Sequence, residues 1–348
     1  MKYRGVLIGC GFFARNHMHG WADVPGVEIV AVCDRDPDKV AAYQRDFGVA
    51  QGFTDAATML AQVKPDFADV ATTVESHRPL VELCLSHGAL TICQKPFAET
   101  YVDALAMVQA AKAADRPLIV HENFRWQKPF RRLGELIRAG AIGQPHFLRL
   151  SFSHAYDVYA NQPYLAQVRN FALMDVGLHL FDVARFLVGD VTRISCFTRQ
   201  LNPRVTGEDS FVALLTHHSG VTSSIECSFF SHFAEERFPQ TLAQVEGTRG
   251  VLEVLPDYRL RIHGPEGVSE ESADTDVPAW GERPWHVLQE SVRAFQAHVA
   301  DVLAGRAEPQ PSGAHNLQTL ALTLAAYQSA DRGRSVDMGA FVANGAIR

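Results

Sequence analysis

Long apolar runs are missing from this 348-residue sequence. No stretch approaches the roughly 18 apolar residues of a membrane-spanning helix. The start, Met1 to Arg4, leads directly into a strand-like segment, without the apolar core and cleavage site of a signal peptide. We therefore expect a cytoplasmic protein that does not bind membranes.

Paired cysteines and a surplus of basic residues are also missing. Six cysteines are scattered without a C-x-x-C pair, which predicts free buried thiols. The formal net charge of −7 gives no general attraction to nucleic acid. The histidines show no metal-ligand spacing, so we expect no metal. With 47% hydrophobic and 20% charged residues, the chain falls among ordinary globular proteins and has room for about two domains.

A glycine-rich turn follows the first strand-like segment. Gly9 ends that segment, Gly11 follows two residues later, and Ala14 begins a segment that can form a helix. In this pattern the first glycine permits a sharp turn, the second lets a pyrophosphate approach the backbone, and the small third residue lets the helix lie on the strand. The N–H groups at a helix start favour phosphates. We predict a dinucleotide site, although ordinary tight turns also match the pattern.

An acidic residue at the end of the next strand-like segment, 27–33, supports this prediction. Asp34 lies 23 residues beyond Gly11, near the separation of about 20 at which a carboxylate binds the adenosine ribose. A turn aspartate before Pro37 is the alternative interpretation. The carboxylate favours NAD because it repels the 2′-phosphate of NADP. Arg35 softens that preference, so NADP is a secondary cofactor.

Strand-like and helical segments alternate as far as residue 124. We expect strands at about 65–72, 90–93 and 117–121, and helices at about 37–47, 77–87 and 99–114. Strands separated by helices form a doubly wound parallel sheet, which binds ligands beyond the carboxyl ends of its strands. We predict an α/β fold with a Rossmann domain over 1–124.

The second half changes to consecutive strands. Helices at about 129–139 and 172–187 flank a strand at 145–153, and further strands follow at 191–200, 209–217, 220–230, 240–247, 250–255 and 258–263. Their short connections predict an α+β domain over 125–311 with a large, mostly antiparallel open sheet. Residues 265–283 resemble a surface excursion. Helices at about 285–304 and 313–331 follow, and the C-terminal segment 312–348 is expected to pack back on the chain.

Polar residues follow the ends of the predicted parallel strands. One of them, Lys95, is a candidate for chemistry, because a lysine partly desolvated beside a nicotinamide can lose its proton and act as a base, or orient a substrate oxygen. A surface lysine in a turn before Pro96 is the alternative. The whole set is Thr72, Thr73, Gln94, Lys95, His121 and Asn123.

Asp175 and His179 are four residues apart in a predicted helix. That spacing places both side chains on one helix face. A carboxylate can orient an imidazole, which is the usual acid or base of dehydrogenases. An aspartate near a helix start with a core histidine, or half of a metal site, are the alternatives for an isolated pair.

These elements together resemble the Gfo/Idh/MocA oxidoreductases, the family of glucose–fructose oxidoreductase and inositol dehydrogenase. The resemblance covers nearly the whole chain, including Asn123-Phe124-Arg125 and the Ala-rich last helix. It implies that Lys95 lies between nicotinamide and substrate, and that Asp175 and His179 flank the reacting carbon. The residues that carry it are Gly9, Gly11, Ala14, Asp34, Thr72, Thr73, His77, Gln94, Lys95, Pro96, Asp175, Gly177 and His179.

The resemblance also implies further contacts. Phe12 and Phe13 line the nucleotide cleft, with packing at the helix start as the alternative. Arg125 and Trp126 lie where the family contacts substrate, and Trp126 serves equally well as a stacking platform for a sugar or as a domain-interface anchor. The remaining cofactor candidates are Arg35, Thr72, Thr73, His77 and Gln94, and the remaining substrate candidates are Asn123, Tyr156 and Arg169.

One position departs from the family pattern. The family usually has glutamate before the lysine, whereas this sequence has Gln94. Glutamine keeps its hydrogen-bonding capacity but carries no negative charge. We therefore expect Lys95 to be held less strongly as a cation, which eases its use as a neutral base. A Gln94→Glu variant with an unchanged pH–rate profile would contradict this hypothesis.

We predict NAD-dependent oxidation of a sugar or polyol, most simply of a pentose at its anomeric carbon to a lactone. The segment from Gly9 to His17 is also similar to members that oxidise D-apiose. The hydroxyl-bearing carbon gives hydride to the nicotinamide, His179 takes the hydroxyl proton, and Lys95 bonds the same oxygen. Asp175 orients the imidazole or a neighbouring hydroxyl. The sequence favours neither Lys95 nor His179 as the formal base.

Other family functions remain as alternatives. They are a cyclitol dehydrogenase, a glycosidase-like enzyme that uses NAD only transiently, and a non-catalytic regulator that binds the cofactor. Retention of Lys95 and His179 argues against the regulator. In the family the outer face of the open sheet forms dimers and tetramers, so we expect a homodimer or homotetramer.

Overall fold

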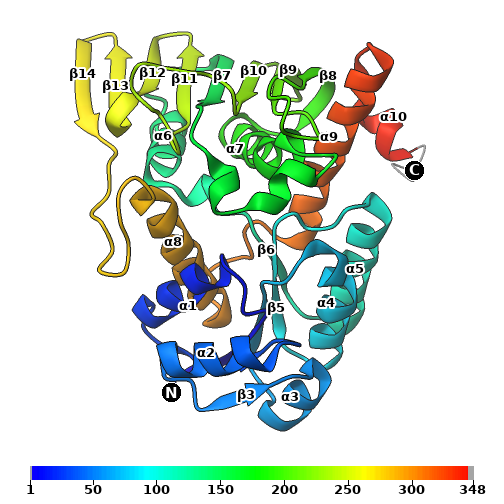
Figure 1. The fold of residues 1–348 in the computed structure, drawn as a ribbon. Helices are drawn as coiled ribbons and strands as arrows, with labels where there is room; N and C mark the ends of the chain where they lie inside the picture. The colour runs from blue at the N-terminus through cyan, green and yellow to red at the C-terminus, as the bar shows by residue number, and fades with distance from the viewer. Residues whose placement is uncertain (1, 344–348) are drawn as a thin grey trace. The chain divides into compact units, whose positions relative to one another are not determined.

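The computed structural model describes residues 2–343 and divides them into two compact units (Figure 1). The first comprises residues 2–123 and 289–320, and the second comprises residues 124–288 and 321–343. The predicted boundary at 124 lies one residue from this division, whereas 289–311, assigned with the second domain, groups with the first unit. The end of the predicted segment 312–348 lies outside the described residues.

Six parallel strands form the sheet of the first unit. Their order, 3-2-1-4-5-6, is that of a Rossmann fold, which confirms the predicted class. The order reverses between β1 and β4, so the carboxyl end of β1, where Gly9 follows, is the expected ligand-binding edge. The strands are β3 (Gln51–Phe53), β2 (Val27–Cys33), β1 (Tyr3–Ile8), β4 (Phe67–Val70), β5 (Leu90–Gln94) and β6 (Leu118–His121).

Local capping residues set the bounds of several helices in this unit. Asp36 and Asp55 accept hydrogen bonds from backbone N–H groups at the starts of α2 and α3, and Gly48 ends α2 with a left-handed conformation. The short β3 and α3 were not predicted. The three residues of β3 are mostly exposed and give no hydrophobic alternation. The helices are α1 (Ala14–Asp23), α2 (Pro37–Phe47), α3 (Ala56–Val63), α4 (His77–Ser86) and α5 (Tyr101–Ala114).

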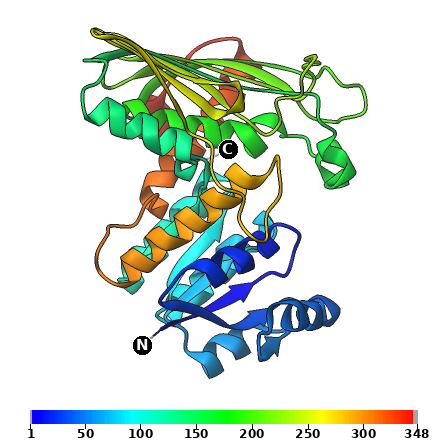
Figure 2. The ribbon, with the colours of Figure 1, turned by 90° about the vertical axis from the view of Figure 1, so that its left-hand side faces the viewer.

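A nine-stranded sheet forms the second unit. Only β7 and β10 pair in parallel, which confirms the predicted mostly antiparallel sheet. From Phe211 to His217, residues of β9 alternate between buried and exposed, because α6 (Lys128–Arg138) and α7 (Leu178–Val188) lie along one face of the sheet (Figure 2). The strand order is β14 (Gly267–Ser272), β13 (Arg259–Gly264), β12 (Gly250–Leu255), β11 (Leu242–Gly247), β7 (Pro145–Ser153), β10 (Thr222–Ser228), β9 (Ser210–His217), β8 (Val191–Arg199) and β15 (Val336–Asp337).

The edge strand β14 lies in the segment that we expected to be a surface excursion. Its residues are mostly exposed, and its register comes from pairing with β13 and from ion pairs of Glu270 with Arg259 and Arg261. A mostly polar strand at a sheet edge has no apolar alternation, so its sequence gave no strand signal.

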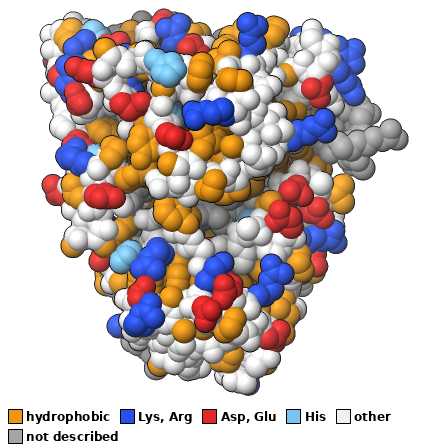
Figure 3. Space-filling view, in the orientation of Figure 1, with side chains coloured by type: hydrophobic (Ala, Val, Ile, Leu, Met, Phe, Trp, Pro, Cys, Tyr) orange, Lys and Arg blue, Asp and Glu red, His pale blue; other side chains and the backbone are white. Residues whose placement is uncertain are grey.

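The predicted terminal helices correspond to α8 (His286–Leu303) and α9 (Gly313–Arg332), and α10 (Met338–Ala343) follows. All six cysteines are free and buried, as predicted. Among the described residues, no helix combines the length and apolar character needed to cross a membrane. On the face shown in Figure 3, Lys and Arg side chains lie among Asp and Glu side chains.

Candidate active site

The two glycines after β1 have different surroundings. Gly9 has a φ of +101°, and a Cβ atom there would lie 2.6 Å from the carbonyl oxygen of Ala71. Only glycine fits such a conformation and such a close approach. By contrast, no atom lies within 4 Å of the place that a Cβ of Gly11 would occupy. The loop therefore turns tightly at Gly9 and leaves open space beside Gly11.

The start of α1 is free to bind an anion. Its first turn has no side-chain cap and no acidic residue. The Asn16 amide donates to the Phe13 carbonyl, which leaves the N–H groups before Asn16 to bind phosphates. Ala14 is buried in a core cluster, as its small size predicted. Phe12 is 63% exposed, so packing does not explain it, whereas Phe13 is 37% exposed and its ring meets His17 edge-on.

Asp34 holds the same loop from the end of β2. Its Oδ2 accepts a hydrogen bond from the Cys10 amide at 2.8 Å, and its Oδ1 accepts one from the Asp36 amide at 3.0 Å. A carboxylate has about four acceptor sites, so two remain for ribose hydroxyls. The neighbouring Arg35 is exposed. Tyr43 braces the loop by donating from its hydroxyl to the carbonyl of Gly11 at 2.7 Å.

A buried histidine, His77, connects the loop after β4 with the segment after β5. The ring nitrogens of His77 lie 3.1 Å from the Thr72 carbonyl oxygen and 3.3 Å from that of Phe97. Burial lowers the pKa of His77, which favours the neutral ring. His77 thus ties the loop after β4 to the segment after β5, while Thr73 is exposed.

Together these features fit a bound dinucleotide. Gly11 leaves room for a pyrophosphate, the α1 start offers free N–H groups, and Asp34 keeps acceptor sites for a ribose. Gln94 is buried at the end of β5, and Lys95 follows it half-buried. The Lys95–Pro96 peptide bond is cis.

In the second unit, Asp175 lies in a π-helical turn, Leu173–Gly177, that leads directly into α7. This wider turn departs from the regular helix on which the spacing argument rested, and such turns are frequent at functional sites. Glu208 fixes its start. The carboxylate of Glu208 accepts hydrogen bonds from the amides of Phe171 and Leu173 and from the hydroxyl of Tyr327.

His179 lies in the first turn of α7 and is only 3% exposed. Its ring stacks on that of Phe124, with centroids 4.0 Å apart and planes at 3°. The next residue, Arg125, forms two hydrogen bonds of 2.6 Å with the fully buried carboxylate of Asp182 on α7. Stacking and ion pair together fix the segment Phe124–Trp126 on α7.

The remaining predicted substrate residues are divided between the two units. Asn123 belongs to the first unit, where its amide donates to the Ser291 hydroxyl at 2.8 Å. Trp126 and Tyr156 are half-buried, and the Tyr156 ring stacks on Phe238. Arg169 is exposed and lines a cavity of about 850 Å³ within the second unit.

Two buried polar groups were not among the predicted site residues. His154 directly follows β7, and its Nδ1 accepts a hydrogen bond from the Tyr156 amide, so a neutral ring carries its proton on Nε2. Within residues 2–343, neither that Nε2 nor the Tyr159 hydroxyl has a hydrogen-bond partner. Burial lowers the pKa of His154 to about 4, while the charges of Glu236 and Asp175 act in the opposite direction. The position of His154 after a predicted strand was the available signal.

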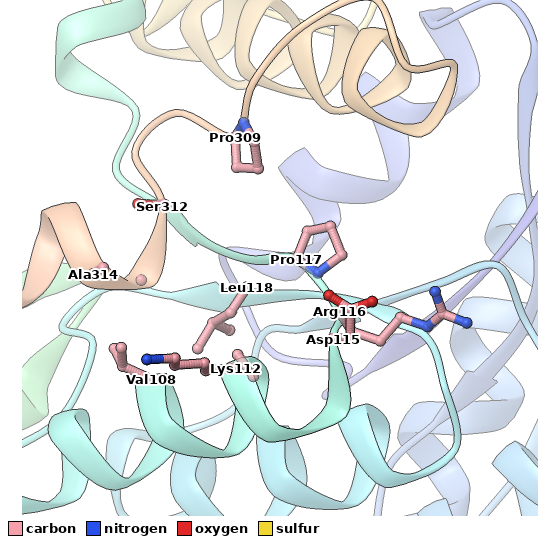
Figure 4. Close-up of a pocket in the computed structure, with 11 residues that line it drawn as sticks. Val108, Lys112, Asp115, Arg116, Pro117, Leu118, Pro309, Ser312 and Ala314 are labelled. Atoms are coloured by element: carbon pink, nitrogen blue, oxygen red, sulfur yellow. The ribbon is translucent and has the colours of Figure 1, made fainter.

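Another hollow, of about 480 Å³, lies in the first unit between α5, β6 and the start of α9 (Figure 4). Its two cations, Lys112 and Arg116, extend in opposite directions, and it contains none of the predicted site residues. Over the described part of the chain, no cluster of His, Cys, Asp and Glu has a geometry that could hold a metal ion.

Comparison with protein families identifies two matching regions. Residues 3–122 match the model described as an oxidoreductase family with an NAD-binding Rossmann fold, and residues 130–253 match the GFO/IDH/MocA C-terminal domain. These regions correspond to the strand-and-helix part of the first unit and to most of the large sheet of the second.

Similar proteins span nearly the whole chain. A D-apiose dehydrogenase of Paraburkholderia graminis is 49% identical over 97% of this chain and 90% of its own length. A second, from Rhizobium rhizogenes, is 46% identical over 98% of this chain and 99% of its own length. A crystal structure of an oxidoreductase from Agrobacterium radiobacter, in complex with NAD+, L-tartaric acid and magnesium, has a TM-score of 0.96. That protein is 46% identical, and the match covers 98% of this chain and all of the other.

Proposed function

The chain belongs to the Gfo/Idh/MocA oxidoreductases, and we propose that it oxidises D-apiose at the anomeric carbon to the corresponding lactone. Its cofactor is NAD, and the nicotinamide accepts a hydride when bound. The observation that carries the choice of sugar is the identity of 46–49%, over nearly the whole chain, with two D-apiose dehydrogenases.

The cofactor residues are assigned from the loop geometry. In this proposal Gly11 and the start of α1 bind the pyrophosphate, and Asp34 binds the adenosine ribose. Phe12, Phe13, Thr72 and the other predicted cofactor residues line the same binding region. Asp34 gives the preference for NAD, because its carboxylate repels a 2′-phosphate, and exposed Arg35 permits weaker use of NADP.

Three residues carry the proton chemistry in this proposal. His179 accepts the proton of the reacting hydroxyl, and Lys95 donates a hydrogen bond to the same oxygen. Asp175 orients the imidazole or a neighbouring sugar hydroxyl. The stacking of His179 on Phe124 supports this role, because a fixed ring presents its nitrogens in one direction. Buried His154 is proposed to donate from Nε2 to a substrate oxygen.

The test is NADH formation from NAD with D-apiose, other pentoses, hexoses and cyclitols, with NADP in parallel. We expect stoichiometric NADH, the highest kcat/KM for D-apiose, and a loss of at least about a hundredfold in the Lys95→Ala and His179→Ala variants. The Arg116→Ala variant, altered at the unrelated hollow, serves as the matched control and should retain full activity.

Other outcomes favour the other functions. A higher kcat/KM for a cyclitol than for D-apiose would identify the cyclitol as the substrate. Tight NAD binding with glycoside cleavage but no net NADH would indicate a glycosidase-like enzyme. Binding of NAD with no turnover of any sugar, cyclitol or glycoside would favour the regulator.

We also propose that two or four copies associate through the outer face of the large sheet. Phe197 on β8 pairs with Val212 on β9, and Leu214 lies two residues further along β9. These side chains are 66%, 45% and 50% exposed, so they form an apolar surface on the face opposite α7. A contiguous exposed apolar surface is typical of protein–protein interfaces.

A further inference from the structure

A line of hydrogen bonds runs from the core of the first unit to the backbone of Lys95. Asp69 on β4 lies 2.9 Å from Nδ1 of His17 on α1. The Nε2 of His17 lies 3.1 Å from Nε2 of Gln94, whose Oε1 accepts a hydrogen bond from the Lys95 amide at 2.6 Å. Residues from three separate elements therefore meet behind the proposed catalytic lysine.

These groups are shielded from water. His17 and Asp69 are 0% exposed and Gln94 is 7% exposed. The Asp69 Oδ2 also accepts a hydrogen bond from Trp21 Nε1 at 2.8 Å. The His17 ring stacks on that of His121, with centroids 4.1 Å apart. Water cannot replace a partner that any of them loses, so each hydrogen bond restricts the next.

The arrangement determines where the protons lie. The Lys95 amide can only donate, so the Gln94 atom that faces it must be the oxygen, and the Gln94 NH₂ group must face His17. An NH₂ group donates, so Nε2 of His17 must be unprotonated. The proton of the neutral ring is then on Nδ1, where it is donated to Asp69. The hydrogen-bond pattern thus selects one tautomer of His17.

We propose that His17 is a positioning residue for Lys95, acting through Gln94, and that glutamine at position 94 keeps the His17 ring neutral. The inference rests on the proposed catalytic role of Lys95. Asp69 and Trp21 orient the imidazole, the imidazole orients the Gln94 amide, and the amide oxygen fixes the backbone of Lys95 at the end of β5.

The family residue, glutamate, would act differently at this position. An ionised carboxylate cannot donate to His17 Nε2, so the Gln94→Glu variant needs one more proton between the two side chains. We expect that proton on His17, because the ring then lies between the carboxylates of Asp69 and of Glu at 94. The rings of His121 and Phe13 also face the His17 ring, and neither is an acidic group. The added negative charge would then be neutralised at His17, in contrast to the expectation from the sequence that residue 94 acts on the charge of Lys95.

The proton positions are tested by ¹⁵N NMR of histidine-labelled protein at pH 7, which needs no substrate. The His17 signals are assigned by their loss in a His17→Gln variant. We expect a protonated Nδ1 and an unprotonated Nε2 in the natural protein, and two protonated nitrogens in Gln94→Glu. A protonated Nε2 in the natural protein, or an unchanged ring in the variant, would overturn the proposal.

The positioning role is tested with two matched variants. In His17→Asn the amide lies near the place of Nδ1 and keeps a donor for Asp69, whereas in His17→Gln the amide oxygen lies near the place of Nε2 and keeps an acceptor for Gln94. We expect hydrogen exchange of the Lys95 amide to accelerate about tenfold or more in His17→Asn and to change less in His17→Gln. Equal exchange in both variants would show that His17 only fills space.

Kinetics with D-apiose completes the test. After normalisation to the NADH-binding fraction, we expect kcat to fall about tenfold in His17→Asn with little change in KM, and to be largely retained in His17→Gln. Equal kcat values would overturn the positioning role even if the sugar is turned over. Failure of the natural protein to oxidise any sugar would overturn the proposed function instead, while the NMR and exchange results would still decide the hydrogen-bond proposal.

Discussion

Gly9 and Gly11 are two residues apart, but a methyl group would meet different surroundings at each. In Gly9→Ala the Cβ atom collides with the Ala71 carbonyl at a positive φ, so we expect destabilisation by about 1–3 kcal/mol. In Gly11→Ala the methyl group enters open space, so the unfolding temperature should be unchanged while NAD affinity falls about tenfold or more. Thermal unfolding and NAD titration of both variants measure this. Unchanged NAD affinity in Gly11→Ala would contradict the assigned pyrophosphate position.

His154 is expected to matter for substrate rather than for stability. His154→Phe keeps a ring among Phe152, Phe229 and Phe238 and removes a buried donor that lacks a protein partner. The variant also removes the acceptor of the Tyr156 amide, which offsets this gain, so we expect stability at pH 7 within about 1 kcal/mol of the natural protein and an increase of about tenfold in KM for the sugar. Phe230→Ala, at an exposed ring on the loop after β10, is the control. A KM for the sugar equal to that of the natural protein would show that His154 does not bind the substrate.

At the scale of elements, the contact of the segment Phe124–Trp126 with α7 includes a buried ion pair between Arg125 and Asp182 beside the stacked rings of Phe124 and His179. Without Arg125 the buried Asp182 carboxylate loses two hydrogen bonds but still interacts with Arg185, so Arg125→Met should destabilise the protein by about 2–3 kcal/mol in urea unfolding. The Arg125→Met/Asp182→Leu double variant should recover part of this loss, because both members of the pair are removed together while buried Arg185, on which the charge of Asp182 also acts, keeps its ion pair with Asp190.

The control for this experiment is an exposed ion pair in the same unit. Arg259→Met removes the surface contact with Glu270 and should cost less than about 1 kcal/mol. Arg125 was also a predicted substrate contact. A stable Arg125→Met variant with a raised KM would support substrate binding over a structural role.

At the scale of the whole molecule, the apolar outer face of the large sheet predicts assembly. Leu214→Arg places a charge within the proposed interface and should shift the mass in sedimentation experiments toward that of one chain. Val268→Arg, at an exposed apolar residue on the edge strand β14, is the matched control and should leave the mass unchanged. A natural protein that sediments as a single chain would contradict the proposed interface.

The free energy of unfolding should decrease at acid pH because His154 is buried. The pKa of His154 falls from 6.5 to about 4 on folding, so between these values the unfolded chain binds a proton that the folded chain does not. Its stabilising contribution is therefore present above pH 6.5 and is lost as the pH falls toward 4. Between pH 7 and pH 5, the natural protein should lose about 2 kcal/mol more unfolding free energy than His154→Phe. Parallel pH dependences in urea unfolding would contradict this.

The sequence by itself determined the features that depend on local backbone requirements and on short periodic patterns. Alternating strands and helices predicted the Rossmann sheet, and Gly9, Gly11 and Ala14 predicted its nucleotide loop. The signal was strong because a tight turn, a close approach and a small helix contact each restrict the residue type at one position. Asp34 also follows a strand of this sheet, and its separation of 23 residues from Gly11 was enough to predict a ribose-binding carboxylate.

Only the tertiary structure decided which distant polar groups meet. Asp69 lies 52 residues from His17, and Gln94 lies 77 residues from it, so no periodicity joins them. The same holds for Arg125 and Asp182, 57 residues apart, and for the polar edge strand β14, whose register depends on β13. The physical reason is that a buried polar group needs a partner in space, and the separation of the two residues along the chain does not specify that partner.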